Sequence, residues 1–170
     1  KENDNYKLGI ELNSKVFDIE KAKTKTIYSF GDVPTSMTEI LQDPKEKINQ
    51  INKFIDDLGV EVEQYLIDKE NIEWWPVVIN PEKIICVGLN YAKHADESNL
   101  PHPSVPIIFN KYNNSLTGHK QQIGIPENIK QVDYEAELAI IIGKEAKNIS
   151  SNEALEHVLG YAVSNDLSSR

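Results

Sequence analysis

The sequence contains one cysteine, one arginine and no apolar run long enough to cross a membrane, and each shortage excludes a class of protein. A single cysteine, Cys86, cannot support an internal disulfide framework and suits a reducing, cytoplasmic location. Without an apolar run of about 20 residues or a signal-peptide pattern, we expect no membrane association. The net charge of −9 argues against a nucleic-acid partner.

The 170 residues, 39% hydrophobic and 26% charged, are typical of a globular protein with a sizeable core. The Trp74–Pro76 segment could line a ligand groove, but adjacent tryptophans before a proline more often pack at a domain boundary. We therefore predict a small N-terminal α/β domain over residues 1–75 and a second domain over residues 76–170. The first contains no histidine, and we interpret it as a scaffold.

Local patterns predict the elements of the first domain. Residues 6–11 and 15–18 favour two short strands joined by a polar turn. Ser36 precedes Glu39 by three positions, which is typical of a capping box at a helix start. Pro44 suits the first turn of a second helix that ends at Gly59.

The most informative segment of the second domain is Val132–Gly143, where polar and apolar residues alternate before an apolar run. The pattern predicts one strand whose tail enters a core, with Asp133, Glu135 and Glu137 on one face. Neighbouring carboxylates on that face lie roughly 7 Å apart and repel each other when desolvated. Mg²⁺, Mn²⁺ or Ca²⁺ would remove that cost. The alternative is a solvated acidic face on a half-exposed strand.

Two further segments add candidate groups. A Ser150 capping pattern predicts a helix that ends at Gly160, with His157 on its polar side. The strand that follows places Asp166 at its end, where a third carboxylate can join a metal site. Arg170, the single arginine, can hold a substrate carboxylate through its fork of donors.

Upstream, residues 83–88 and 106–110 are typical of short strands, and we expect Cys86 to be buried in the first. Between them, His94 and Glu97 share one face of a helical turn. A carboxylate beside an imidazole orients it to activate water, although a surface pair is the alternative.

Together these segments resemble the fumarylacetoacetate hydrolase family over about residues 83–170. Each motif alone is weak evidence for the family, but the motifs in this order and spacing are specific for it. The segments that carry the resemblance are Gly88–Tyr91, His94 with Glu97, Asp133–Leu138, Gly160–Tyr161 and Asn165–Arg170.

The resemblance implies an α+β fold, a mixed β-roll that usually forms a homodimer. It implies Mg²⁺ or Mn²⁺ as the cofactor and a small 2-oxo or diketo acid as the substrate. Its implied site residues are the metal ligands Glu135, Glu137 and Asp166, the water-activating pair His94 and Glu97, and the substrate contacts Lys111 and Arg170.

Three functions stay open from the sequence. The first is metal-dependent hydrolysis of a C–C bond in a diketo acid, such as an acylpyruvate, in aromatic catabolism. The second is isomerisation or decarboxylation of a 2-oxo acid, which needs no attacking water. The third is a non-catalytic metal-binding module or incomplete fragment, because family domains extend past the residue equivalent to Arg170. We accordingly expect the sequence to be part of a longer chain.

Overall fold

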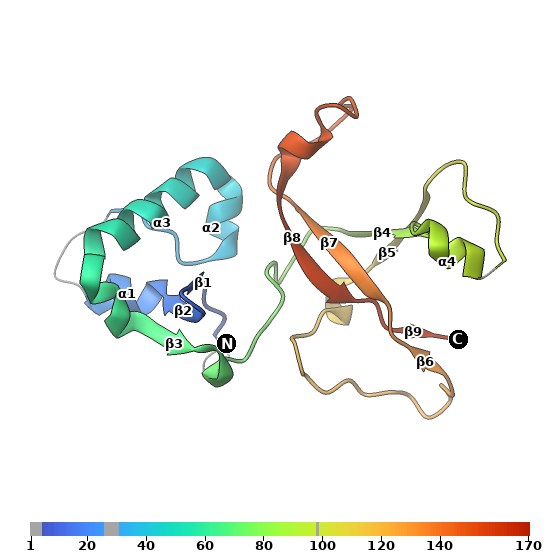
Figure 1. Ribbon diagram of the computed structural model, residues 1–170, viewed down its shortest axis with the longest axis horizontal. Helices are drawn as coiled ribbons and strands as arrows, with labels where there is room; N and C mark the ends of the chain where they lie inside the picture. The colour runs from blue at the N-terminus through green and yellow to red at the C-terminus, as the bar shows by residue number, and fades with distance from the viewer. Residues whose placement is uncertain (1–4, 26–30, 98) are drawn as a thin grey trace.

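The computed structural model describes residues 5–25, 31–97 and 99–170. Figure 1 shows two parts joined by a segment without helix or strand, residues 72–83. Each part combines helices with antiparallel strands. Among the described residues, no helix has both the length and the apolar character needed to cross a membrane.

The first part is a three-stranded antiparallel sheet covered by helices, with strand order β1-β2-β3. Its strands are β1 (Gly9–Leu12), β2 (Lys15–Asp18) and β3 (Leu66–Asp68). Its α-helices are α1 (Ile19–Lys25), α2 (Met37–Gln42) and α3 (Pro44–Leu58). Short 3-10 helices follow, η1 (Gly59–Tyr65) and η2 (Lys69–Asn71).

Local chemistry explains these elements. Asn13 and Ser14 both have positive φ angles, 49° and 66°, which match the right-handed twist of a two-residue hairpin. The predicted capping box is confirmed, because Ser36 Oγ accepts the Glu39 amide at 3.2 Å. Glu39 in turn accepts the Thr35 amide at 3.0 Å.

The first part contains the hydrophobic core of the described chain. The Phe17 ring lies 6.1 Å from the Phe54 ring and 6.4 Å from the Tyr65 ring, measured between centroids. Phe54 lies on α3, whose buried stripe also includes Ile51 and Leu58. This packing gives the first part a close-packed core. Its role as a scaffold stays a prediction.

The second part is built from antiparallel pairs, β4 with β5, β6 with β9 and β7 with β8. Its strands are β4 (Ile84–Gly88), β5 (Ile107–Lys111), β6 (Val132–Asp133), β7 (Ala136–Ile142), β8 (Val158–Asn165) and β9 (Ser168–Ser169). Its helical elements are α4 (Ala92–Glu97), η3 (Asn113–Ser115) and η4 (Ala154–His157).

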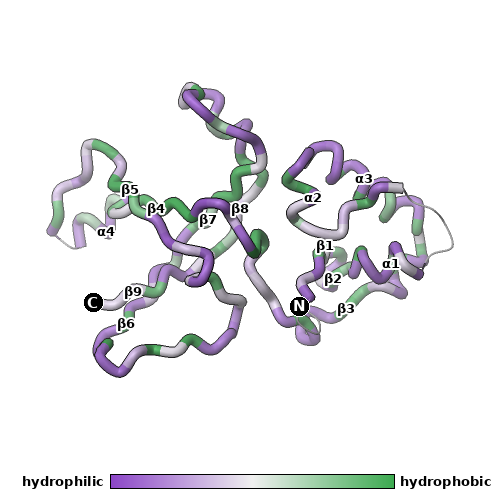
Figure 2. The backbone as a smooth tube through the Cα atoms, turned by 180° about the vertical axis from the view of Figure 1, so that it is seen from behind, coloured by the Kyte–Doolittle hydropathy of each residue, from purple (hydrophilic) through white to green (hydrophobic). Residues whose placement is uncertain are grey.

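These pairs differ from the expected roll, since the strands of the described segments do not close into a barrel. The apolar tail of β7 does not enter a core either. Leu138, Ile140 and Ile142 are each more than half exposed, because they point to the face that the described chain leaves uncovered. Figure 2 shows the same hydrophobic character along β4, β5, β7 and β8. Cys86 of β4 is half-buried rather than buried.

The predicted single strand over Val132–Gly143 is wrong in one respect. It divides into β6 and β7 at Tyr134 and Glu135. The Asn165 side-chain oxygen accepts a hydrogen bond from the Glu135 amide at 3.1 Å. A side chain therefore replaces a backbone carbonyl as the acceptor at this point between the strands. The break turns the chain while it leaves Glu135 beside the end of β8.

The predicted helix from Ser150 to Gly160 is also wrong. The Ser150–Glu153 contacts do form, at 2.7 and 3.1 Å, but they lead only into η4. Gly160 instead pairs with Ile141 in the β7–β8 ladder, because strand pairing outweighs a weak helix preference. His157 is consequently buried and contacts the Lys144 carbonyl, where a polar helix face was expected.

Candidate functional site

The three predicted metal ligands lie where β7 and β8 meet β6 and β9. Glu137 stands opposite Ser164 in the β7–β8 ladder, and Glu135 comes two residues earlier. The Asp166 amide donates to the Glu135 carbonyl at 2.8 Å, which continues the antiparallel contact past the end of β8. All three carboxylate residues are half-buried. The backbone therefore brings residues 135, 137 and 166 to one place, although they lie far apart in sequence.

Lys111 reaches this place from the end of β5. Its ammonium group donates to a carboxylate oxygen of Asp166, in an ion pair whose side chains are 31% and 15% exposed, respectively. Partial burial strengthens such a charge-assisted bond compared with a surface pair. A predicted substrate contact is thus paired directly with a predicted metal ligand.

Arg170 supplies a second cation. Its Nε and Nη2 atoms donate to Asp133 Oδ2 at 3.0 and 2.9 Å, and Nη2 also donates to Glu135 Oε1 at 2.5 Å. The Arg170 amide donates to the Gln131 carbonyl at 3.0 Å, which anchors the backbone beside β6. Hydrogen bonding to Asp133, and then to Glu135, raises the pKa of the guanidinium above its ordinary value.

The carboxylates suit a hard divalent cation in their chemistry, since Mg²⁺ and Mn²⁺ prefer carboxylate oxygens. The Asp166 and Glu135 side chains, however, are directed to Lys111 and Arg170, respectively. Across residues 5–25, 31–97 and 99–170, no three Asp, Glu, His or Cys side chains converge enough to hold a metal ion as placed. The metal role of Glu135, Glu137 and Asp166 stays a prediction.

The predicted pair His94 and Glu97 lies on α4, which is drawn next to β4 and β5 in Figure 1. Both side chains are exposed, and the hydrogen bonds recorded for the described residues do not join them. The same helix instead forms another imidazole–carboxylate contact, in which His102 Nε2 lies 2.7 Å from Asp96 Oδ1. The water-activating role of His94 stays a prediction.

Sequence reasoning missed two residues of this site. Asp133 was placed on the acidic face but not recognised as the main partner of Arg170. The sequence pattern includes Asn165 in the Asn165–Arg170 segment but does not indicate that its side chain accepts a hydrogen bond from the Glu135 amide. The only sequence signal for this contact is that the single arginine must find an acidic partner. The 37 positions between Asp133 and Arg170 give no local pattern that identifies which one.

Two hollows lie in the second part and its junction with the first. One, of about 470 Å³, adjoins the Lys111–Asp166 pair. It is lined by Glu82, Lys83, Ile84, Ile85, Asn110, Lys111, Tyr112 and Asn113. Its volume falls in the range of small-molecule sites.

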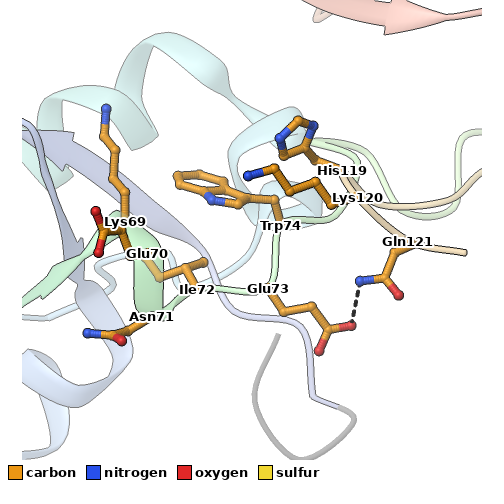
Figure 3. Close-up of a pocket in the computed structure, with 9 residues that line it drawn as sticks. All are labelled: Lys69, Glu70, Asn71, Ile72, Glu73, Trp74, His119, Lys120 and Gln121. Carbon is orange, nitrogen blue, oxygen red and sulfur yellow. Dashed lines mark hydrogen bonds between the residues drawn. The ribbon is translucent and has the colours of Figure 1, made fainter.

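The larger hollow, of about 620 Å³, is shown in Figure 3. It lies between η2 with the following residues and a loop after η3, with Trp74 and Lys120 at its wall. Gln121 donates to Glu73 at 3.2 Å across it. None of the predicted site residues lines this hollow. Trp74, which is 38% exposed, borders this hollow, and a ligand role for Trp74–Pro76 stays a prediction.

Comparison with known proteins identifies a related family. The model described as "Fumarylacetoacetate (FAA) hydrolase C-terminal" matches residues 83–170, just over half of the chain. Oxaloacetate tautomerase fahd2, mitochondrial, of Xenopus laevis is 41% identical over 138 residues, which cover 81% of this chain and 42% of the relative.

Solved structures share the fold. A protein from Mycobacterium smegmatis is 26% identical with a TM-score of 0.68, and the match covers 96% of this chain and 53% of that one. A fumarylacetoacetate hydrolase from Exiguobacterium antarcticum is 24% identical with a TM-score of 0.65, over 100% and 55% of the two chains. The chain thus spans about half the length of these relatives, or somewhat less.

Proposed function

The chain belongs to the fumarylacetoacetate hydrolase family, and we propose that it supplies the site of an enzyme that interconverts keto and enol forms of a 2-oxo dicarboxylic acid. A relative named as an oxaloacetate tautomerase, 41% identical over 138 residues, supports this reaction. The proposal therefore narrows the predicted functions to the isomerase alternative.

The observation that carries the proposal is the meeting of Lys111 and Arg170 at the acidic junction of β7 and β8. A 2-oxo dicarboxylate carries two negative charges, and two cations from separate elements can each bind one end of it. The planar fork of Arg170 suits a carboxylate, whereas the Lys111 ammonium suits a single oxygen. The hollow beside Lys111 gives a small acid room to approach.

Tautomerisation requires one bond exchange and no added reactant. The C–H bond next to the 2-oxo group breaks, a base takes the proton, and the oxygen gains the negative charge of an enolate before it is protonated. A hydrogen bond from Lys111 to that oxygen stabilises the charge as it develops. Arg170 fixes the distant carboxylate so that the reacting carbon is held in place. A bound Mg²⁺ or Mn²⁺ would add Lewis-acid polarisation of the same oxygen.

His94 and Glu97 are the proposed proton carriers. An imidazole has the pKa needed to exchange a proton near neutral pH, and Glu97 can orient it when the two side chains meet. Because both lie on a short, exposed helix, we propose that α4 approaches the carboxylates when substrate binds.

Hydrolytic cleavage of a C–C bond is the second candidate, on the strength of the family alone. It requires a water molecule activated near the substrate. The similarity to a relative named as an oxaloacetate tautomerase favours tautomerisation over this hydrolysis. The same assay also tests the two remaining alternatives. A decarboxylase would release carbon dioxide, and a non-catalytic module would bind the metal without activity. The expected homodimer and cytoplasmic location stay predictions.

The test uses the full-length protein with Mg²⁺ or Mn²⁺ and follows loss of the ultraviolet absorbance of enol-oxaloacetate. Arg170→Gln should reduce kcat/KM by roughly 10- to 1,000-fold, since it removes a charged substrate contact. Lys53→Gln on α3 removes one positive charge far from the site and should leave kcat/KM unchanged. Product analysis with an acylpyruvate detects hydrolysis, and carbon dioxide release detects decarboxylation. Metal binding without any of these activities would contradict the proposal and support the module.

A further inference from the structure

The two ion pairs at the carboxylate junction have a consequence for metal binding. Glu135 and Asp166 each give an oxygen to a positive side chain, Glu135 to Arg170 and Asp166 to Lys111. A lone pair that accepts a bond from a guanidinium or ammonium group is not available to a divalent cation, which must displace that group or use the remaining lone pairs of the carboxylate. The positive charges would also repel that cation at close range.

We propose that Lys111 and Arg170 compete with the divalent cation for these carboxylates, so that metal binding is an exchange of partners. This inference rests on the proposed function, because it concerns the same metal ligands. In the exchange, Asp166 leaves Lys111 and Glu135 leaves Arg170. The affinity for the metal is then set partly by the strength of the two ion pairs.

The exchange is asymmetric. Arg170 makes two bonds to Asp133, at 3.0 and 2.9 Å, and can keep them when Glu135 is taken away. Lys111 is different, because the ion pairs recorded for the described part of the chain give it no carboxylate besides Asp166. Metal binding therefore frees the Lys111 ammonium while Arg170 stays in position.

A freed Lys111 beside a hollow creates a binding site for an anion only after the metal has bound. The order of binding follows from this, with the cation first and the acid second. An acid that arrives first meets Lys111 already neutralised by Asp166. Asp133 is accordingly a positioning residue that keeps Arg170 ready for substrate throughout.

The first experiment measures Mn²⁺ binding to chelator-treated, full-length protein by calorimetry, without substrate. Lys111→Met removes the competing charge and should tighten the Kd for Mn²⁺ several-fold. Lys53→Met removes one charge from α3 and should leave the Kd unchanged. Measurable binding with an unchanged or weakened Kd in Lys111→Met overturns the exchange but not the proposed function. Absence of Mn²⁺ binding in the wild type and in Lys111→Met overturns the exchange together with the metal site.

A second measurement does not depend on how the variant folds. An amine-acetylating reagent is applied to the wild-type protein with and without saturating Mn²⁺, and each lysine is followed by peptide mass spectrometry. Release from Asp166 should speed acetylation of Lys111 several-fold, while Lys53 reacts at an unchanged rate. If Lys111 reacts equally fast, or more slowly, when Mn²⁺ is bound, the exchange does not occur.

Discussion

Arg170 directs two of its nitrogens at a single oxygen of Asp133, with Nε at 3.0 Å and Nη2 at 2.9 Å. The two residues are held in register by β6 and β9, where Asp133 pairs with Ser168 and the Arg170 amide bonds to Gln131. Asp133 thus fixes the position of the guanidinium without belonging to the predicted metal ligands.

Asp133→Asn should raise KM for the 2-oxo acid several-fold more than it lowers kcat. The amide removes the charge that orients Arg170, so substrate binding suffers before the chemical step does. Steady-state kinetics on the full-length protein provide the measurement. Asp133→Glu should restore part of the loss, whereas Asp57→Asn on α3 should have no effect. A pure loss of kcat with KM unchanged would contradict the positioning role.

Core packing gives a prediction for stability. Phe54 is buried between α3 and the sheet and faces Phe17. Phe54→Ala leaves a cavity that the neighbours only partly fill, and should reduce the free energy of unfolding by about 3–5 kcal/mol. Urea unfolding followed by circular dichroism measures the change. Val60 is 90% exposed, and Val60→Ala should change stability by less than about 0.5 kcal/mol. Equal effects of the two variants would contradict this packing.

The elements that sequence predicted best are those fixed by neighbouring residues. The Ser36–Glu39 capping box and the turn at Asn13 depend on side chains a few positions apart, and the structure confirms both. The end of β7 and the place of Gly160 in a strand depend on pairing between residues more than ten positions apart. Local sequence patterns do not encode such pairing.

The site shows the same division. Alternation placed Glu135 and Glu137 together, but no spacing rule links Asp166 to Lys111, which are separated by 55 positions. Their ion pair follows from the way β5 and β8 are arranged. The family resemblance implies a role for each of the two residues, yet it does not imply that they contact each other.

Glu153 provides a pH-dependent prediction. Hydrogen bonds from the Ser150 side chain and then from its amide lower the pKa of the Glu153 carboxyl below its ordinary value. A lowered pKa in the folded state stabilises the fold above the unfolded pKa, and this contribution is lost as pH falls through the folded pKa. Ser150→Ala should therefore raise the pKa of Glu153 and destabilise the loop near neutral pH but not in strong acid. Carbon NMR titration of Glu153 measures the shift, with Ser151→Ala as the control. An unchanged Glu153 pKa in Ser150→Ala would contradict the assignment.

Gly118 and Gly124 form a matched pair for testing the contact between the Trp74 segment and the loop after η3. A Cβ atom on Gly118 would lie 2.1 Å from the Trp74 carbonyl oxygen, whereas one on Gly124 would meet nothing within 4 Å. Because the obstruction at Gly118 is backbone, the loop must move away from Trp74 to accept a methyl group.

Gly118→Ala should reduce the free energy of unfolding by about 1–3 kcal/mol, in line with other overpacked sites. It should also alter tryptophan fluorescence, since Trp74 lines the hollow that the loop closes. Gly124→Ala should match the wild type in both measurements. If the two variants behave alike, the loop does not rest against Trp74. A change in fluorescence without a change in stability would mean that the loop moves but contributes little to folding.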